Sequence, residues 1–409
     1  MYHHPWRAAA RATTLVIGAA LLTQASAKTS WRGPERDGVY PEKKLLSAWP
    51  KGGPKLVLTI SDIGEGFSSP AVTANRIYIN GMIDKAGYLF ACDKSGKLLW
   101  KVDYGPEWSD SYSGVRGSPV VAGDRIYIQS GRGRVVCLNT ADGKELWAVD
   151  MENTFGAIST KWGHAETMLL AGNKLFCTPG GTKAAVAALD PATGKTIWTT
   201  QGIKQKAGYC SPALVTHNGK ELLVTMLSES VIGIDPGTGK LLWHHPHKTD
   251  YGVNPNTPIS TNGSIVYASG YGNGAGMLKL SDDGARVSRV WREPSFDVQI
   301  GGTVLLGTML YGFGHNNRGL HCLDITTGKI THTLPKTKAG AVIAADGLLY
   351  CYGEDGNVSL VQPTGQKITE VSSFAITRGK GPHWAHPVIK DGRLYVRHGE
   401  FLMVYDIGK

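Results

Sequence analysis

The sequence predicts an all-β protein, an eight-bladed β-propeller whose blades are four-stranded antiparallel sheets. A turn of the form Asp/Asn-x-x-x-Gly-Lys, followed by two further residues and then Trp, recurs at intervals of about 45 residues. Each interval also contains short apolar runs separated by turn residues, which is typical of a propeller blade. Eight starts of such units can be counted along the chain.

The repeated turn is the strongest of these signals. It is clearest at 190–198 and 235–243, with further copies at 139–147 and, one residue shorter, at 93–100. Its Asp accepts backbone N–H groups and its Gly supplies a left-handed conformation, whereas the following Trp has a large ring to bury. On an outer strand that ring is expected to pack on the neighbouring blade. The tryptophans expected to clamp blades together are Trp100, Trp147, Trp198, Trp243 and Trp291.

Each blade is expected to begin with a short strand around the central channel. Four starts share a Ser/Thr-Pro pair and four are degenerate. The eight starts lie at 69–70, 118–119, 166–167, 211–212, 257–258, 301–302, 340–341 and 386–387. The second strand is an alternating run of β-branched and aromatic residues, the third leads into the repeated turn, and the fourth carries the Trp.

The two ends of the chain predict how the ring closes. After the eighth start only three strands remain, and 406–409 form the first half of the repeated turn. The second half is found near the other end at 53–58, with Leu58 in the place of the Trp. We expect this N-terminal strand to complete the last blade and to remove its open edge. Residues 28–409 then form one circular domain.

Residues 1–27 predict a secretory signal peptide. Arg7 and Arg11 precede an apolar stretch at 14–22 and small residues that end at Ala27, where cleavage is expected. The stretch is too short for a membrane span, and no cysteine follows it that would accept a lipid. The sequence therefore predicts a periplasmic or secreted protein with neither a membrane span nor a lipid anchor.

The distribution of charge argues against a nucleic-acid-binding protein, and the positions of the cysteines argue against a disulfide-linked one. Removal of the leader lowers the formal charge from +10 to +8, and the basic residues are spread along the chain, which argues against a nucleic-acid partner. Cys137 and Cys322 occupy equivalent positions in opposite blades, as do Cys177 and Cys351, too far apart for disulfides. We expect all six cysteines to be small buried residues.

A small-molecule site is expected where the loops between blades meet at one mouth of the channel. Glu166 and His164 replace the usual start of the third blade by an acid and a base, and His383 lies in a His-Trp-Ala-His run. These three are the expected catalytic residues. The expected ligand-binding residues are Glu65, Arg116, Lys161, Tyr209, Asn256, Asp297, Gln299, His315, Lys338, Trp384 and His386. The alternative for each is a hydrogen-bonded plug of the channel. A metal ligand set is not identified, although Glu65 and Asp297 are candidates for calcium.

The repeat at 188–198 resembles the tryptophan-docking motif of the pyrroloquinoline quinone (PQQ) type propellers, the quinoprotein alcohol dehydrogenase-like superfamily. Residues 31–38 and 64–70 are similar to its short exported members, the PQQ-binding-like β-propeller repeat proteins. The resemblance covers 31–409 and implies an oxidoreductase of the alcohol or sugar dehydrogenase type, with PQQ and calcium as cofactors. Those enzymes cover PQQ with a disulfide between adjacent cysteines, and this chain has no Cys-Cys pair.

Two functions therefore stay open. In the first, the protein binds or oxidises a small polar substrate, a sugar or an alcohol, at the channel mouth. In the second, implied by the related fold of the outer-membrane assembly factor BamB, it is a non-catalytic scaffold for a periplasmic protein. Convergent acids and histidines at the mouth favour the first function.

Overall fold

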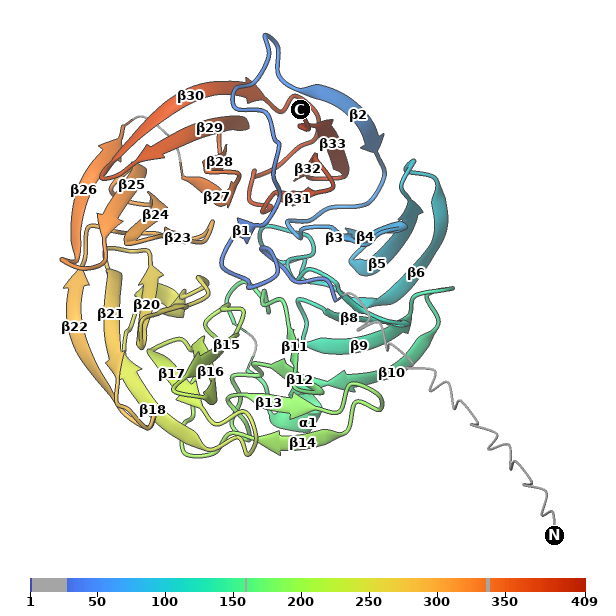
Figure 1. The fold of residues 1–409 in the computed structure, drawn as a ribbon. Helices are drawn as coiled ribbons and strands as arrows, with labels where there is room; N and C mark the ends of the chain where they lie inside the picture. The colour runs from blue at the N-terminus through green and yellow to red at the C-terminus, as the bar shows by residue number, and fades with distance from the viewer. Residues whose placement is uncertain (2–27, 159, 336–338) are drawn as a thin grey trace.

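The computed structural model describes Met1 and residues 28–158, 160–335 and 339–409. Their strands form eight sheets around a central axis (Figure 1), so the predicted eight-bladed propeller is confirmed. Consecutive strands within each blade pair antiparallel. All eight predicted blade starts lie at or just before an innermost strand.

The first four blades follow the chain in order. Blade one contains β3 (Ala71–Val72), β4 (Arg76–Ile83), β5 (Ala86–Asp93) and β6 (Leu98–Pro106). Blade two contains β7 (Val120–Ala122), β8 (Arg125–Gln129), β9 (Arg134–Asn139) and β10 (Glu145–Asp150), and is followed by the helix α1 (Met151–Phe155). Blade three contains β11 (Leu169–Ala171), β12 (Lys174–Cys177), β13 (Ala187–Leu189) and β14 (Thr196–Thr199). Blade four contains β15 (Ala213–His217), β16 (Lys220–Met226), β17 (Ser230–Ile234) and β18 (Leu241–Pro246), and is followed by the 3-10 turn η1 (Asp250–Gly252).

The other four blades complete the ring. Blade five contains β19 (Ile259–Thr261), β20 (Ser264–Ser269), β21 (Gly274–Leu280) and β22 (Val287–Glu293). Blade six contains β23 (Val304–Leu306), β24 (Met309–Gly314), β25 (Gly319–Asp324) and β26 (Lys329–Leu334). Blade seven contains β27 (Gly340–Ala345), β28 (Leu348–Gly353), β29 (Asn357–Thr364) and β30 (Lys367–Ala375), with β1 (Val39–Tyr40) added parallel to β27. Blade eight contains β31 (Val388–Lys390), β32 (Arg393–His398), β33 (Phe401–Asp406) and β2 (Lys55–Ile60).

The hydrophobic core is divided among the interfaces between blades. Eight clusters of buried apolar residues are found among the described residues, and each joins two neighbouring blades. Middle strands are covered by a blade on both faces, which is why β28 is a continuous apolar run that is buried throughout. Outer strands such as β10 are exposed at alternate residues instead.

The repeated turn joins several blades to the next through a ring and a glycine. The Trp147 indole lies against Gly194 in the turn of blade three, and its Nε1 donates to the Pro191 carbonyl oxygen at 3.1 Å. Gly194 has a φ of 71°, and a Cβ there would lie 2.6 Å from the indole. The turn therefore requires glycine for two separate reasons. The other pairs of this kind are Trp100 on Gly143, Trp198 on Gly239 and Trp291 on Gly328. Trp243 packs in the cluster between blades four and five.

The outermost strand of blade eight comes from the N-terminal part of the chain. β2 pairs antiparallel with β33, with Lys55 opposite Asp406. Leu58 takes the position of the docking ring, because a Cβ on Gly96 of blade one would lie 2.4 Å from Leu58 Cδ1.

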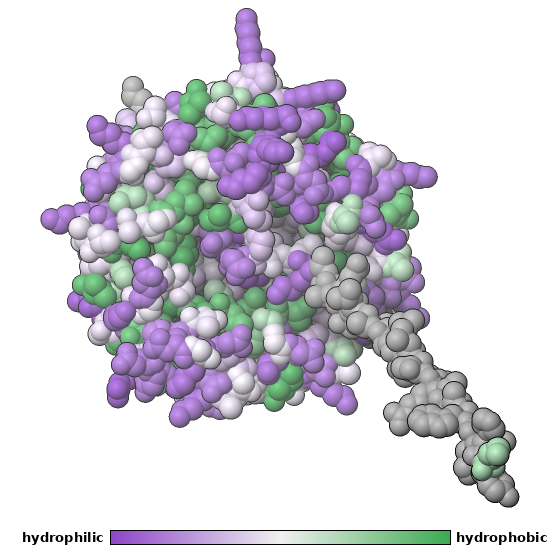
Figure 2. All heavy atoms as spheres, viewed as in Figure 1, coloured by the Kyte–Doolittle hydropathy of each residue, from purple (hydrophilic) through white to green (hydrophobic). Residues whose placement is uncertain are grey.

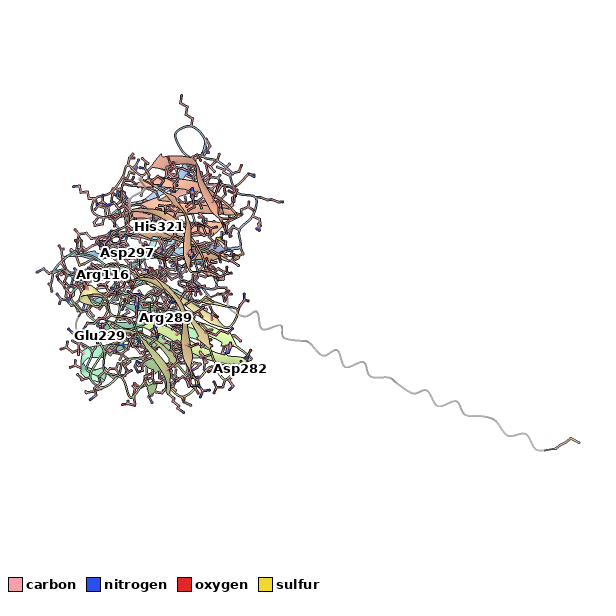
Figure 3. The ribbon with its side chains drawn as sticks, turned by 90° about the vertical axis from the view of Figure 1, so that its left-hand side faces the viewer. Arg116, Glu229, Asp282, Arg289, Asp297 and His321 are labelled. Carbon is pink, nitrogen blue, oxygen red and sulfur yellow. The ribbon has the colours of Figure 1, made fainter. Side chains whose placement is uncertain are left out.

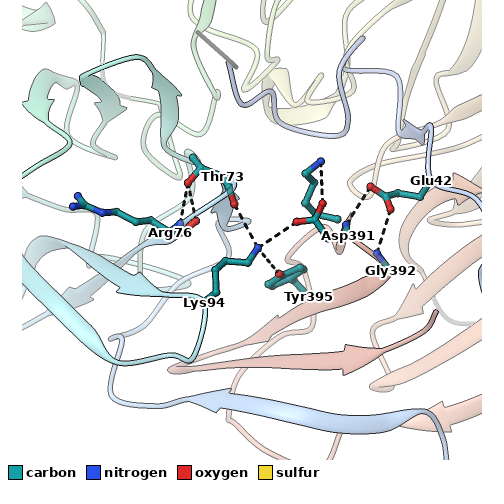
Figure 4. A network of polar contacts seen from close by, with 8 residues as sticks. Glu42, Thr73, Arg76, Lys94, Asp391, Gly392 and Tyr395 are labelled. Carbon is teal, nitrogen blue, oxygen red and sulfur yellow. Dashed lines mark hydrogen bonds and ion pairs between the residues drawn. The ribbon is translucent and has the colours of Figure 1, made fainter.

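Polar contacts join blades eight and one on the channel side of β2 (Figure 4). Lys94 Nζ donates to the Thr73 carbonyl oxygen and to the Tyr395 hydroxyl, and pairs with Asp391 at 3.5 Å. The Glu42 carboxylate accepts the backbone N–H groups of Asp391 and the following glycine, both at 3.2 Å. The seam that closes the ring thus combines an apolar clamp with charged contacts.

Residues 28–40 lie within the channel, which the sequence did not predict (Figure 1). The Thr29 backbone N–H donates to Val121 of blade two at 2.9 Å, and β1 pairs with the innermost strand of blade seven. Two buried arginines lie between these contacts. Burial lowers the pKa of both Arg32 and Arg36 to about 10.

Each of these arginines donates to the segment just before the innermost strand of a different blade. Arg32 donates to the Gly301 and Thr303 carbonyl oxygens of blade six. Arg36 donates to the Thr167 and Met168 carbonyl oxygens of blade three. The segment therefore ties together blades two, three, six and seven across the channel.

All six cysteines are buried and free, as expected. Within the part of the chain that the structure describes, no helix has the length and apolarity needed to cross a membrane. The predicted signal peptide falls on residues 2–27, which lie outside the described residues. Hydrophilic and hydrophobic residues are interspersed around the rim on the face that Figure 2 shows.

Candidate ligand site at the channel mouth

The loops between blades enclose a cavity of about 490 Å³ at one mouth of the channel. Aromatic rings dominate its wall. They belong to Trp31, Phe67, Tyr112, Trp162, Tyr209, Tyr271 and Trp384. Trp31, from the segment inside the channel, also lines a second cavity of about 440 Å³ bounded by blades eight, one and two. It therefore separates the two cavities.

Four tyrosines around the mouth adopt a left-handed backbone, which bulky residues rarely do. Their φ angles are 47° at Tyr112, 68° at Tyr209, 61° at Tyr251 and 58° at Tyr271. This conformation costs a non-glycine residue about 1 kcal/mol. Such strain persists only where the surrounding structure imposes it, and it is found most often at functional sites.

The rings form two groups. In the first, which we call the Trp384 platform, Phe67 and Tyr112 lie 5.1 Å and 4.8 Å from Trp384, measured between ring centroids. In the second, the Tyr271 platform, Tyr251 lies 5.8 Å from Tyr271 and 5.7 Å from Trp162. Tyr209 belongs to the second platform as well, 6.2 Å from Trp162.

Each platform is hydrogen-bonded to one polar side chain. Trp384 Nε1 donates to Glu354 Oε1 at 2.7 Å. Gln299 Nε2 donates to the Tyr271 hydroxyl, also at 2.7 Å. Both polar side chains line the cavity. Gln299, Tyr209 and Trp384 were predicted from the sequence, whereas Glu354 and the remaining rings were not. Aromatic residues in or beside nearly every inter-blade loop are the signal that would have identified them.

Arg116 lines the cavity but its donors are used within its own loop. Its guanidinium donates to the carbonyl oxygens of Ser111, Tyr112 and Gly114 at 3.0, 2.8 and 2.7 Å. Burial, opposed by the nearby Glu107, lowers the pKa of Arg116 to about 10. In Figure 3 Arg116 lies on the same side of the molecule as Asp297. Arg116 thus fixes the loop that carries Tyr112.

Asn256 and Asp297 are also satisfied by the protein itself. Asn256 Nδ2 donates to two carbonyl oxygens, and Asn256 Oδ1 accepts the Gly302 N–H at 3.1 Å. The buried Asp297 carboxylate accepts two backbone N–H groups at 2.8 Å each. Their geometry matches the hydrogen-bonded plug that was the alternative for these residues.

Two of the four predicted histidines, His386 and His315, line the cavity. His386 Nδ1 lies 3.3 Å from the Arg32 guanidinium, and burial together with that positive charge lowers the pKa of His386 well below its usual value. The His315 ring lies 5.2 Å from the Tyr271 ring.

The predicted acid and base of blade three lie beneath the mouth. Glu166 and His164 share a void of about 10 Å³, and neither lines the large cavity. Burial raises the pKa of Glu166 to about 7 and lowers that of His164 to about 4. Glu166 Oε1 accepts the Thr178 N–H at 2.6 Å. Tyr209 lines both spaces and separates this pair from the mouth.

The third catalytic candidate is held elsewhere. His383 Nδ1 lies 2.6 Å from the Tyr352 hydroxyl, and its ring stacks on that of His398 with a centroid distance of 3.6 Å. Burial, aided by His398, lowers the pKa of His383 to about 4. His383 does not line the cavity, so the structure does not bring the three catalytic candidates together.

The remaining predicted residues surround the mouth. Lys161 is exposed, and its Nζ lies over the rings of Trp162 and Tyr251 at 4.9 Å and 4.3 Å. Glu65 is exposed and accepts a hydrogen bond from a serine hydroxyl at 2.9 Å. Lys338 lies outside the described residues.

These residues do not fit a calcium-bound PQQ. Among the described residues, no group of three or more His, Cys, Asp or Glu side chains is arranged to hold a metal ion. Among the residues that the structure describes, Glu354 is the one carboxylate in the cavity wall, and Trp384 already donates to it. No adjacent cysteine pair exists to cover a quinone. We therefore assign no role to PQQ in this protein.

Comparison with known proteins gives a family match. The family described as outer membrane protein assembly factor BamB matches residues 85–334, more than half of the chain. BamB of Kangiella koreensis is 24% identical over 209 residues, which are 50% of this chain and 49% of the relative. BamB of Salmonella typhimurium is 35% identical over 91 residues, 21% of this chain and 22% of the relative. The matches thus span at most about half the length of these curated relatives.

Solved structures share the fold. BamB from Moraxella catarrhalis superposes with a TM-score of 0.59 at 14% identity, covering 86% of this chain and 97% of that one. A quinohemoprotein alcohol dehydrogenase from Comamonas testosteroni gives a TM-score of 0.64 at 13% identity, covering 92% of this chain and 79% of that one. At these identities the likeness extends to the fold alone.

Proposed function

This chain belongs to the family described as outer membrane protein assembly factor BamB, and we propose that it acts as a binding propeller, holding a sugar or an alcohol at its channel mouth without converting it. In this proposal residues 28–409 form one domain, which works in the periplasm or outside the cell after removal of the leader.

The observation that carries the proposal is the set of residues that line the cavity at the mouth. Aromatic rings line the cavity, while Glu166, His164 and His383 lie outside its wall. General acid–base catalysis requires a group within hydrogen-bond reach of the reacting atom. Binding requires only a concave, mainly apolar wall with a few placed polar groups, as this mouth has.

A neutral polar ligand suits the charges of the wall. Within the described part of the chain, Glu354 and Arg116 are the one carboxylate and the one guanidinium of this wall. Arg116 donates to three carbonyl oxygens of its own loop, so these donors are not available to an anionic substrate. Hydroxyl groups would find partners in Gln299, His315 and Glu354 instead.

The second candidate function is a scaffold for a protein partner, which the family match favours. In that role the mouth loops would receive an apolar side chain of a periplasmic protein involved in outer-membrane protein assembly. Aromatic side chains are frequent at such interfaces.

Calorimetric titration with sugars and alcohols, combined with a dye-linked oxidation assay in the presence of PQQ and calcium, tests the proposal. We expect heat of binding without turnover, and loss of that heat when Trp384→Ala and Tyr271→Ala are combined in one protein. An exposed-rim variant, Leu146→Ala, is the matched control. Turnover in the oxidation assay would instead identify the protein as an oxidoreductase. Absence of binding to every sugar and alcohol, with capture of a periplasmic protein, would support the scaffold.

A further inference from the structure

Resting on the proposed function, we infer that the mouth holds two sugar rings of one linear saccharide, one on the Trp384 platform and one on the Tyr271 platform. The ligand class is then an oligosaccharide or a glycan strand rather than a monosaccharide. The inference rests on the division of the rings, the polar side chain of each platform, and the cations that already lie over the rings.

The rings are divided into two separate binding faces. Both platforms line the same cavity, the second through every member except Tyr251. Among the described residues no ring contact joins Phe67, Tyr112 or Trp384 to any member of the other group. The faces of aromatic rings are electron-rich and attract the polarised C–H groups on the flat side of a sugar ring. Two separated faces in one cavity therefore provide two ring-sized subsites.

Each platform also has one polar side chain with an oxygen atom that accepts no hydrogen bond from the described residues. Glu354 uses Oε1 to accept from Trp384, and no contact of Glu354 Oε2 is found among the described residues. Gln299 uses Nε2 to donate to Tyr271, and no contact of Gln299 Oε1 is found in the same part of the chain. A carboxylate oxygen and an amide oxygen both accept hydrogen bonds from hydroxyl groups. Each subsite thus pairs a stacking face with a hydroxyl acceptor.

The protein's own cations exclude a different class of ligand. Aromatic groups of this size would otherwise suit a quaternary ammonium ligand. Lys161 Nζ already lies 4.3 Å from the Tyr251 ring centroid, and the Arg116 guanidinium lies 5.9 Å from that of Phe67. A cationic ligand would be repelled by these charges, whereas a neutral sugar would not.

The strained loops favour binding by holding the rings in place. Tyr112, Tyr251 and Tyr271 are fixed at positive φ, and Arg116 donates three hydrogen bonds to the Tyr112 loop. A rigid site loses little conformational entropy when a ligand binds.

Dependence of affinity on saccharide length tests the inference. The probes are glucose and linear β-1,4-linked oligomers of glucose and of N-acetylglucosamine, from the dimer to the hexamer, titrated by calorimetry. When one ligand occupies two subsites, the second contact is intramolecular, so affinity should rise at least about tenfold from glucose to the longer oligomers. Trp384→Ala and Tyr271→Ala should each remove that rise, because one platform survives in each variant and the longer oligomers then bind about as tightly as glucose.

Two control variants distinguish lost stacking from lost folding. Tyr271→Phe keeps the ring and should keep the length dependence, and Leu146→Ala on the outer rim should behave as the parent. Each variant is checked by its melting temperature. Equal affinity for glucose and for every oligomer would overturn the two-subsite inference while the proposed function stands. Failure of every saccharide to bind would overturn the two-subsite inference together with the sugar-binding part of the proposed function, and binding of an apolar peptide at the mouth would assign the site to a protein partner.

Discussion

Tyr251 adopts a φ of 61° with its side chain 64% exposed, so its backbone strain is not explained by burial. Glycine adopts this conformation without the steric cost that alanine has. We therefore predict that Tyr251→Gly is more stable than Tyr251→Ala by about 1 kcal/mol, although glycine is usually the less stable of the two. Urea denaturation of the two variants measures the difference.

Val371 provides the matched control because it is exposed on β30, in extended backbone. There the glycine variant should be the less stable one. If the alanine variant were the more stable one at both positions, the backbone at Tyr251 would not be strained.

The buried carboxyl of Glu166 predicts a pH dependence of stability. Burial raises the pKa of Glu166 from 4.5 to about 7, so the folded protein binds this proton more tightly than the unfolded chain does. The resulting stabilisation is complete below about pH 4.5 and is lost as the pH rises through 7. Glu166→Gln removes this dependence. Relative to the parent, its free energy of unfolding should gain on the order of 3 kcal/mol between pH 4.5 and 7.

Denaturation at a series of pH values checks this sign. Glu107→Gln should shift in the same direction, because burial also raises the pKa of Glu107 to about 7. A constant difference between parent and Glu166→Gln over this range would contradict the account.

At the scale of single residues the sequence placed the candidates in the inter-blade loops but could not give the contacts of each side chain. Arg116, Asn256 and Asp297 were expected to bind a ligand, yet their polar atoms are occupied by backbone groups of the loops around them. Buried backbone groups need partners, and polar side chains in loops supply them. Sequence gives the residue type, but only the folded loop decides between a ligand and a carbonyl oxygen.

At the scale of elements, the docking turn predicts a large effect at Gly194. Gly194→Ala introduces both left-handed strain and a clash with Trp147, whereas Gly219→Ala introduces only the strain. Gly219 has a φ of 76° and no atom within 4 Å of its Cβ position. We expect Gly194→Ala to be less stable than Gly219→Ala by about 2 kcal/mol in chemical denaturation. Equal losses in the two variants would show that the ring does not depend on this turn.

Strand order was predictable because its signals are local. The turn, the following Trp and the alternating second strand all lie within one repeat, so eight starts were counted correctly. Trp49 was missed because its role depends on distant contacts. It packs against Tyr350 and Phe374 between blades seven and eight, and its Nε1 donates to Val358 at 3.0 Å. A segment outside the repeat thus provides the ring that blade seven lacks.

At the scale of the whole molecule, the segment inside the channel predicts that Arg32 is important for stability. Arg32 is 2% exposed and donates to two carbonyl oxygens of blade six. Arg32→Met leaves those carbonyl groups buried without a partner, which costs about 2 to 3 kcal/mol. Lys55→Met, on the exposed face of β2, should change the free energy of unfolding by less than about 0.5 kcal/mol. Equal stability of the two variants would show that the segment does not support the ring.

The function was the part that the sequence predicted least. The propeller fold is shared by proteins with different activities, so function has to be argued from the site. Here the site is assembled from loops of several different blades and from Trp31 of the channel segment. Their mutual placement is a property of the closed ring, and no local pattern encodes it.

The central claim is that the ring-lined mouth binds a saccharide chain, and a crystal structure of the protein soaked with cellohexaose tests it most directly. The account predicts electron density for sugar rings on Trp384 and on Tyr271, with hydroxyl groups within hydrogen-bond distance of Glu354 and Gln299. Density for the sugar elsewhere on the molecule, or an empty mouth at saturating cellohexaose, would contradict it.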